Sequence, residues 1–538
     1  MLKSTRSGLL CSTVSGFVVL AALSFTGQAF GQGAAIVNKG VPAPECSARV
    51  NYDRNTDMPG YVADWGGKQV CIPFMPANQL VPSDYAGPDF YADEFTDARI
   101  RERWATCKQD PACAKKVLEG AAPFLKFEPR DTGRVDKAGA IDFEGEVDLK
   151  AIRRPAYFGR APYNEVIAEA EARTYVVEFT APRDNYERIH LKLDKPLKLR
   201  GWYIEGAGVE DGAGNRVQAL VIMNNGGGNE ITGIDDPKSV PVIKEATGSY
   251  VVNKEDTLSE EPGMRHWRGF LHQLNKAGFD VLITDRRGNG ISGGQHGYDT
   301  AAQADDMFRE LEQLSTGDGL RIVTPAGEVL SGVSAAGVLL GGRKPTEIPI
   351  VIGGYSRGSY ATQWAMHKNF VEDCDDGLTD RGCKPARGWA NIKGAILYGP
   401  NSAGLGYRMK GHDLVEAALR VDYNITYYPD SRVLANVGKW PALQIGKGVW
   451  DYVEGLEGSL AAYNRATGPK DIFVFLGPHQ LATQNPENMR FAGERMAAFA
   501  RAAVLGRPEV EGAAKPRNLK ELVTSVPRHW ELTTSPGG

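Results

Sequence analysis

The chain has 538 residues, of which 42% are hydrophobic and 24% are charged. This length allows one large domain with additional elements, and the composition is that of an ordinary soluble globular protein. The formal net charge of −4 argues against nucleic acid or an anionic membrane surface as the main partner.

Residues 1–31 have the order of a secretory signal peptide. Lys3 and Arg6 give a positive start, residues 16–25 form an apolar run, and small residues follow as far as Gly31. The run is too short to span a bilayer, so we expect cleavage and a secreted or periplasmic protein. An N-terminal membrane anchor is the alternative. No later stretch is apolar enough to cross a membrane, and we expect no stable membrane insertion.

The cysteines agree with export. The chain has seven, and removal of Cys11 with the signal peptide leaves an even number. An even number in an exported chain suggests disulfides. The spacing favours three local pairs: Cys46 with Cys71, Cys107 with Cys113, and Cys374 with Cys383. None has the two-residue spacing of a redox or zinc pair, so a metal site is the weaker interpretation.

Two regions with different patterns follow. Residues 32–150 are rich in loops, with one predicted helix at 97–118, and we expect a small region held by disulfides. In residues 151–510, apolar strands alternate with helices. Strands are expected at 174–180, 188–204, 218–223, 279–283, 348–352, 392–397, 442–445 and 472–476, and helices at 270–274, 301–314, 358–370 and 488–505. Such alternation predicts an α/β fold whose mostly parallel sheet is covered by helices on both faces.

Three remaining segments lie outside the alternation. The insertion at 315–347 does not fit it, and neither does the insertion at 402–440. The second insertion contains helix-forming stretches and is a candidate cap over a site. Residues 511–538 form a C-terminal tail.

The sequence Gly354-Tyr355-Ser356-Arg357-Gly358 carries the main chemical signal. A serine hydroxyl is a weak nucleophile until a base accepts its proton and the chain holds it exposed. A tight strand-to-helix turn exposes it, and glycines two residues away on either side relieve the crowding of that turn. A buried-strand pattern precedes this pentapeptide and a helix pattern follows it. We therefore predict a nucleophilic Ser356; the alternative is an incidental turn.

A glycine loop upstream is the expected place for oxyanion donors. Attack by serine on a carbonyl creates an oxyanion, which needs preorganised backbone N–H groups. We expect donors from Arg357 and from Gly227 and Gly228 in the loop that follows Met223. This loop resembles the His-Gly-Gly-Gly loop of esterases and lipases, with Asn225 where histidine is usual. The alternative is a flexible turn after a strand.

Residues 285–294 supply a third motif, Asp-Arg-Arg-Gly-Asn-Gly-Ile-Ser-Gly-Gly, after a predicted buried strand. It resembles the turn after the fourth strand in the α/β-hydrolase superfamily, including its cocaine-esterase-like and X-prolyl-peptidase-like members. The resemblance implies that this turn shapes the surroundings of the site without performing chemistry. We expect Asp285 and Arg287 to form a structural pair.

The acid and the base are expected downstream. The superfamily's order is Ser, then Asp or Glu, then His. Asp451 follows a predicted strand as the superfamily's acid does, with Glu454 as a rival and a surface carboxylate as the alternative. His479 follows the next strand as the base does.

Two further histidines have weaker claims on a role. His529 lies in the tail, and His412 in the predicted cap could touch substrate. A structural histidine is the alternative for the base itself.

The resemblance covers residues 173–506 and implies an α/β-hydrolase fold that carries the Ser356, Asp451 and His479 triad and works without a metal or organic cofactor. The expected substrate is a small-molecule or polymeric carboxylic ester. A serine peptidase or amidase is the second hypothesis, and a non-catalytic binding protein on the same fold is the third. Residues 374–383 could hold calcium through their carboxylates, although a solvated loop closed by a disulfide is preferred. The sequence gives no prediction of oligomeric state.

Overall fold

The computed structural model describes residues 46–51, 56–65, 68–73, 144–152, 154, 172–189, 191–226, 242–244, 250–252, 271–294, 299–373, 383–400, 429, 433, 435–448, 451, 456–475, 479, 486–518 and 521–522. The chain divides into residues 1–36 and 37–538. The predicted signal peptide, the helix at 97–118, nearly all of the predicted cap at 402–440 and the end of the tail lie outside the described residues.

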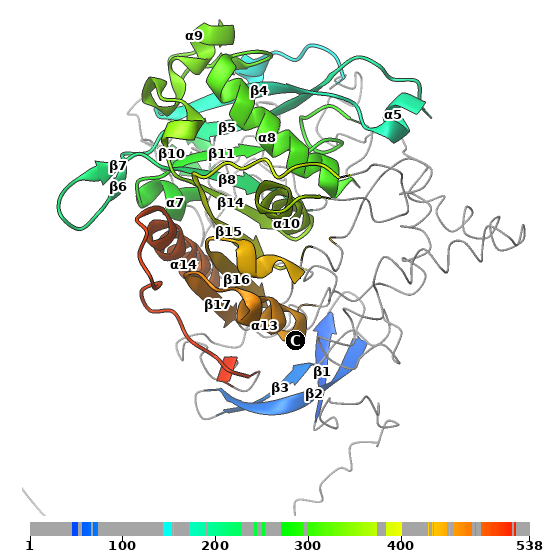
Figure 1. Ribbon diagram of the computed structural model, residues 1–538, viewed down its shortest axis with the longest axis vertical. Helices are drawn as coiled ribbons and strands as arrows, with labels where there is room; N and C mark the ends of the chain where they lie inside the picture. The colour runs from blue at the N-terminus through cyan, green and yellow to red at the C-terminus, as the bar shows by residue number, and fades with distance from the viewer. Residues whose placement is uncertain are drawn as a thin grey trace, which may run out of the picture. The chain divides into compact units, whose positions relative to one another are not determined.

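A ten-stranded sheet organises the described part of the chain (Figure 1). Its strands lie in the order β13 (Val329–Ser331), β12 (Arg321–Val323), β4 (Thr174–Ala181), β5 (Leu197–Ile204), β11 (Asp280–Thr284), β8 (Leu220–Asn224), β14 (Ile350–Tyr355), β15 (Ile392–Tyr398), β16 (Leu443–Gly448) and β17 (Lys470–Phe475). The six strands from β11 to β17 are parallel, and the other four pair antiparallel. The prediction of a mostly parallel sheet is confirmed.

Helices cover both faces of this sheet (Figure 1). Helices α8 (Thr300–Thr316) and α10 (Arg357–Phe370) pack together, as do α7 (His272–Lys276) and α14 (Pro486–Val504), while α13 (Leu456–Arg465) packs against β16 and β17. The side chain of Asn224 reaches Met307 on α8 and Thr362 on α10, whereas a Cβ on Gly394 of β15 would meet Phe499 on α14. The two helix pairs therefore cover opposite faces. None of the described helices has the length and apolar character needed to cross a lipid bilayer.

The ends of α8 follow from its sequence. The Asp299 carboxylate accepts a hydrogen bond from Ala302 N at 3.0 Å and caps the first turn. Gly317 ends the helix with a φ of 81°, a conformation that glycine adopts without steric cost. Between these ends, Phe308, Leu311 and Leu314 are buried against the sheet.

The first insertion extends the same sheet, which the alternation did not predict. Residues 315–347 contain β12, β13 and the short helix α9 (Gly332–Ala336), and β12 pairs with β4. A second small cluster lies at this edge, where Val147, Leu149 and Ile152 pack with Val176, Ile291 and Val323. Residues 144–152 therefore belong structurally with the sheet, on the other side of the predicted boundary at 150/151.

The predicted strand at 188–204 is wrong in its first half. Helix α5 (Asn185–Ile189) occupies the beginning, and β5 starts only at Leu197. Lys192 between them has a φ of 58°, and Leu193 N donates to Glu187 O at 2.9 Å. The chain turns here, although its alternating leucines mimic a strand.

Three smaller sheets complete the described strands. They are β1 (Cys46–Asn51), β2 (Thr56–Trp65) and β3 (Lys68–Pro73); β6 (Val209–Glu210) with β7 (Arg216–Val217); and β9 (Val242–Lys244) with β10 (Tyr250–Val252). Cys46 lies on β1 and Cys71 on β3, with β2 between the two strands. The pairing of Cys46 with Cys71 stays a prediction.

The other cysteine predictions have mixed outcomes. Cys107 and Cys113 lie outside the described residues. Cys383 is disulfide-bonded, and its predicted partner Cys374 is also outside them. Next to Cys383, the backbones of Asp373 and Lys384 exchange hydrogen bonds of 2.9 and 2.8 Å, which close the base of the intervening loop.

Candidate active site

Ser356 stands on a sharp turn between β14 and α10. Its backbone has φ 51° and ψ −119°, a strained conformation for a residue with a side chain. The surroundings hold it there: Ser356 N donates to Tyr398 O at 2.8 Å, and Ser359 N donates to Ser356 O at 2.8 Å. The strand-to-helix turn predicted from the pentapeptide is present.

The flanking glycines are required by close backbone contacts. A Cβ on Gly354 would lie 2.2 Å from Gly358 O, and a Cβ on Gly358 would lie 2.2 Å from Asn224 O. Both distances are far inside van der Waals contact. The turn therefore excludes any side chain at these two positions and packs directly onto the end of β8.

His479 and Asp451 meet Ser356 at the carboxyl ends of the parallel strands. His479 Nε2 lies 2.7 Å from Ser356 Oγ, and His479 Nδ1 lies 2.8 Å from Asp451 Oδ2. A carboxylate can only accept, so Nδ1 carries the proton in the neutral ring and Nε2 is left as an acceptor for the serine hydroxyl. The histidine and aspartate side chains are almost fully buried. This arrangement can draw a proton from serine.

Aromatic side chains fix the histidine ring. Tyr355 stacks on it with ring centroids 5.4 Å apart, and the Tyr355 hydroxyl donates to the His479 carbonyl at 3.0 Å. Tyr398 packs against Tyr355, and burial raises the pKa of the Tyr398 phenol well above its usual value. A Cβ on Gly399 would lie 3.1 Å from the histidine ring. The ring is thus enclosed on several sides.

The predicted oxyanion donors are only partly described. Arg357 is the first residue of α10, and the first N–H groups of a helix have no partner within it. Gly227 and Gly228 lie outside the described residues. At the start of their loop, Asn225 is buried and donates to Asp285 Oδ1 at 2.9 Å, and Arg286 Nε donates to Gly226 O at 3.1 Å. The turn at 285–294 thus anchors the beginning of the glycine loop.

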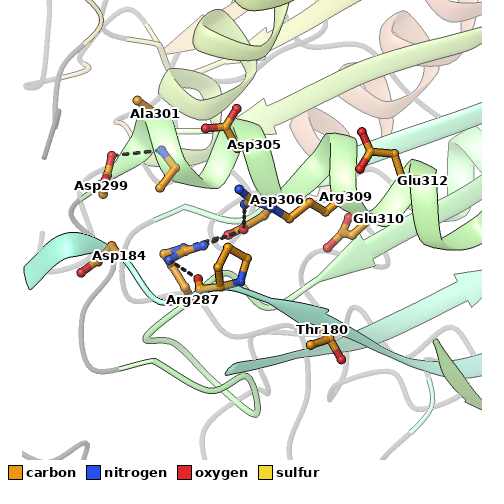
Figure 2. A network of polar contacts seen from close by, with 12 residues as sticks. Thr180, Asp184, Arg287, Asp299, Ala301, Asp305, Asp306, Arg309, Glu310 and Glu312 are labelled. Atoms are coloured by element: carbon orange, nitrogen blue, oxygen red, sulfur yellow. Dashed lines mark hydrogen bonds and ion pairs between the residues drawn. The ribbon is translucent and has the colours of Figure 1, made fainter. Parts of the chain in front are cut away.

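The predicted pairing of Asp285 with Arg287 is wrong. Arg287 makes a two-pronged contact with Asp306 on α8, at 2.8 and 2.6 Å, and Figure 2 shows the two side chains pointing toward one another. Asp285 instead accepts from Asn225 and from Ile291 N at 3.0 Å. Both residues are structural, but they hold different segments: Arg287 holds α8, and Asp285 holds the glycine loop.

Lys447 is a charged residue at the site that the sequence reasoning missed. It is fully buried on β16, and its Nζ lies 3.6 Å from Asp451 Oδ2 and donates to Pro400 O at 2.8 Å. The signal was a lysine at the end of a predicted strand, four residues before the acid. The rival acid Glu454 and the histidines His412 and His529 lie outside the described residues.

A metal centre finds no support among the residues that the structure describes. They contain no group of three or more His, Cys, Asp or Glu side chains arranged to hold an ion. The carboxylates of the candidate calcium loop at 375–380 are outside this part of the chain.

No protein-family model matches the sequence, and no curated protein does. Solved structures are similar over part of it. The Pyrococcus furiosus esterase Pf2001 is 15% identical with a TM-score of 0.33, over 64% of this chain and 99% of that one. The alpha/beta hydrolase GrgF from Penicillium sp. sh18 is 13% identical with a TM-score of 0.30, over 61% and 99%. The Porphyromonas gingivalis dipeptidyl peptidase 4 is 16% identical with a TM-score of 0.32, over 60% of this chain and 35% of the peptidase. Similarity at this level says nothing of substrate.

The chain's own topology can be compared directly with the predicted fold. Numbered along the chain, the eight strands β4, β5, β8, β11, β14, β15, β16 and β17 lie in the order 1-2-4-3-5-6-7-8. The serine turn follows the fifth of them, and the aspartate and histidine follow the seventh and eighth. The strand order and the positions of the serine, aspartate and histidine agree with the α/β-hydrolase fold expected from the sequence.

Proposed function

We propose that the protein is an exported serine hydrolase that cleaves a carboxylic ester through an acyl-enzyme intermediate. The observation that carries the proposal is the continuous contact from Ser356 Oγ to His479 Nε2 and from His479 Nδ1 to Asp451 Oδ2. The strained backbone of Ser356 supports it, because such strain persists where the surrounding structure enforces it and clusters at functional sites.

The mechanism follows from these contacts. His479 Nε2 accepts the Ser356 proton while Oγ forms a bond to the ester carbonyl carbon. Asp451 stabilises the imidazolium that results and keeps the ring oriented. The imidazolium then gives its proton to the leaving alcohol as the ester C–O bond breaks, which leaves an acyl group on Ser356. Water, deprotonated by His479, attacks the acyl carbon; the bond to Ser356 Oγ breaks, Oγ takes the proton back from the imidazolium, and the acid is released.

The developing oxyanion needs donors at the serine turn. We propose the backbone N–H of Arg357 as one, with Gly227 and Gly228 as the source of the other. Such preorganised donors commonly contribute about 3–4 kcal/mol of transition-state stabilisation. The ordered start of the glycine loop, where Asn225 and Gly226 are tied to Asp285 and Arg286, supports this assignment.

Export is the less direct part of the proposal. It rests on the signal-like residues 1–31 and on the disulfide at Cys383, since disulfides persist in oxidising compartments. Fractionating cells that express the full chain tests it. Mature protein that lacks the first residues and appears outside the cytoplasm is expected, and an uncleaved cytoplasmic protein would refute it.

The catalytic proposal is tested with p-nitrophenyl esters of increasing acyl length and with fluorophosphonate labelling. Wild type should hydrolyse the esters and be labelled, and Ser356→Ala should lose both. Ser334→Ala, an exposed serine on α9, is the matched control and should retain both. Labelling that persists in Ser356→Ala would overturn the assignment of the nucleophile.

Assays on the same protein distinguish an amide substrate from an ester substrate. Aminoacyl p-nitroanilides are offered beside the esters, because the same triad can protonate a leaving amine. Serine-dependent cleavage of anilides at rates comparable to esters would replace the esterase proposal with a peptidase. Ester turnover that exceeds anilide turnover by several orders of magnitude supports the ester.

A further inference from the structure

A buried ammonium group stands next to the proposed triad. Lys447 Nζ lies 3.6 Å from Asp451 Oδ2, the same oxygen that accepts from His479 Nδ1. Lysine side chains are almost never fully buried unless paired, because removing an ammonium from water is costly. Lys447 is nevertheless completely inaccessible to solvent. Its place therefore calls for an explanation beyond packing.

The contacts of Lys447 show how it is held. It extends from β16, four residues before Asp451, and its Nζ donates to Pro400 O at 2.8 Å. Pro400 follows Gly399, whose backbone lies against the histidine ring. One cation thus contacts both the acid and the segment that packs on the base.

The charge of Lys447 lies close to both the acid and the base of the triad. In the resting site, a protonated His479 would form an ion pair with Asp451, and this pair would hold the base in an inactive state. An ammonium that shares Asp451 Oδ2 already neutralises that carboxylate, and it also repels a second cation nearby. In a buried site such interactions are weakly screened.

We propose that Lys447 is a positioning residue whose charge, acting through Asp451, sets the acidic limit of the pH range in which the triad works. This inference rests on the proposed function for its catalytic meaning. Lys447 does not touch substrate in this scheme and acts through Asp451. Its second effect is to hold the Asp451 carboxylate facing the histidine when the ring is neutral.

The other titratable groups that the structure places around this chain of contacts do not supply the same effect. Tyr355 from β14 stacks on His479, and Tyr398 from β15 packs against Tyr355 and interacts electrostatically with Asp451. Phenols are neutral in the range where histidine titrates. Among the described residues facing His479, Asp451 supplies the negative charge and Lys447 the positive one.

The test is the pH dependence of kcat/KM for two substitutions. Lys447→Met removes both the charge and the hydrogen bond to Pro400, whereas Lys447→Gln removes the charge and retains a donor. Both should shift the acidic limb of the profile to higher pH by about one pH unit, because without the cation the histidine binds its proton more tightly. KM on the plateau should change little. The proposal would be overturned if the acidic limb shifted in Lys447→Met alone, or if it shifted in neither variant.

Lys470→Met is the matched control. Lys470 begins β17, at the strand end away from the site, and its Nζ donates to Tyr463 O at 3.0 Å and Ala466 O at 2.8 Å. The Lys470→Met variant loses one charge and two hydrogen bonds to carbonyl groups, and the substituted residue does not contact the triad. If Lys447 had only a structural role, Lys447→Met and Lys470→Met could both lower the plateau value of kcat/KM, but the acidic limb of the profile would stay at the same pH.

A second measurement decides the proposal without turnover. The chain has eight histidines, so ring-labelled histidine gives a tractable NMR spectrum in which His479→Asn identifies the resonance. The midpoint of the His479 titration should rise by about one pH unit in Lys447→Gln. If no ester or anilide is cleaved and Ser356 is not labelled, the proposed function fails, while an unchanged His479 midpoint refutes the role of Lys447 on its own.

Discussion

Replacing Glu310 by glutamine should stabilise the protein, and increasingly so as the pH rises. Glu310 lies on the face of α8 that packs on the sheet, and it accepts a hydrogen bond from Thr284 Oγ1 at 2.7 Å. Burial, together with the nearby Asp306 charge, raises the pKa of Glu310 from 4.5 to about 8. The side chain therefore folds as a neutral acid. Glutamine has the same shape, retains the acceptor for Thr284, and cannot ionise.

The magnitude follows from proton linkage. Between pH 4.5 and about 8 the unfolded chain has lost the Glu310 proton and the folded chain retains it. The unfolded state therefore binds fewer protons, and the stability of the wild type falls by about 1.4 kcal/mol per pH unit across this window. Glu310→Gln lacks this loss. We expect its free energy of unfolding, relative to wild type, to increase by about 3 kcal/mol between pH 5 and pH 8.

Urea unfolding followed by tryptophan fluorescence at pH 5 and pH 8 measures the difference. Glu312→Gln on the same helix is the control, because Glu312 is half exposed and its contact with Arg387 is a surface ion pair. Its effect should stay within about 1 kcal/mol at both pH values. If the difference between Glu310→Gln and wild type is the same at pH 5 and pH 8, Glu310 ionises freely in the folded protein and the reasoning fails.

Three further outcomes are expected. Gly358→Ala places a Cβ 2.2 Å from Asn224 O and should lower the unfolding free energy by about 3 kcal/mol; a variant with wild-type stability would refute the close contact. Asp306→Asn removes the charge that Arg287 contacts at 2.6 Å, and calorimetry should show a loss of about 3–5 kcal/mol, whereas a change below 1 kcal/mol would contradict it. Asp451→Asn should reduce kcat by about 10³–10⁴-fold in ester hydrolysis, because the ring loses the tautomer that accepts the serine proton; near-normal turnover would point to another acid.

The fold could be predicted where the sequence signal was local. Continuous apolar runs such as 348–352 can only be buried on both faces, and they became the central parallel strands. The alternation of Ile189, Leu191 and Leu193 was misleading, because alternation over a few residues also occurs in a helix followed by a turn. The pairing of β12 with β4 is a contact between distant parts of the chain, and no local pattern encodes it.

In the candidate site too, features that depend on neighbouring residues could be predicted, and features that depend on distant contacts could not. The serine turn sterically requires glycine at two nearby positions, so Gly354 and Gly358 identify it in the sequence. The ion pair of Arg287 is decided by which carboxylate the packing of α8 brings near, and the sequence offered Asp285 at a shorter separation. Lys447 was missed because a lysine in a strand usually faces solvent, and its burial depends on the neighbouring strand.

The segment at 144–152 determines where the N-terminal region can be cut from the rest of the chain. Glu144 forms an ion pair with Arg183 and accepts from Gly294 N, and Gly145 O accepts from the fully buried Arg200. Cutting the chain at the apparent change of pattern near residue 151 would remove these acceptors from two buried arginines. The N-terminal region is therefore not an exchangeable module joined at that point. A deletion that spares the ten-stranded sheet has to leave residues from 144 onward in place.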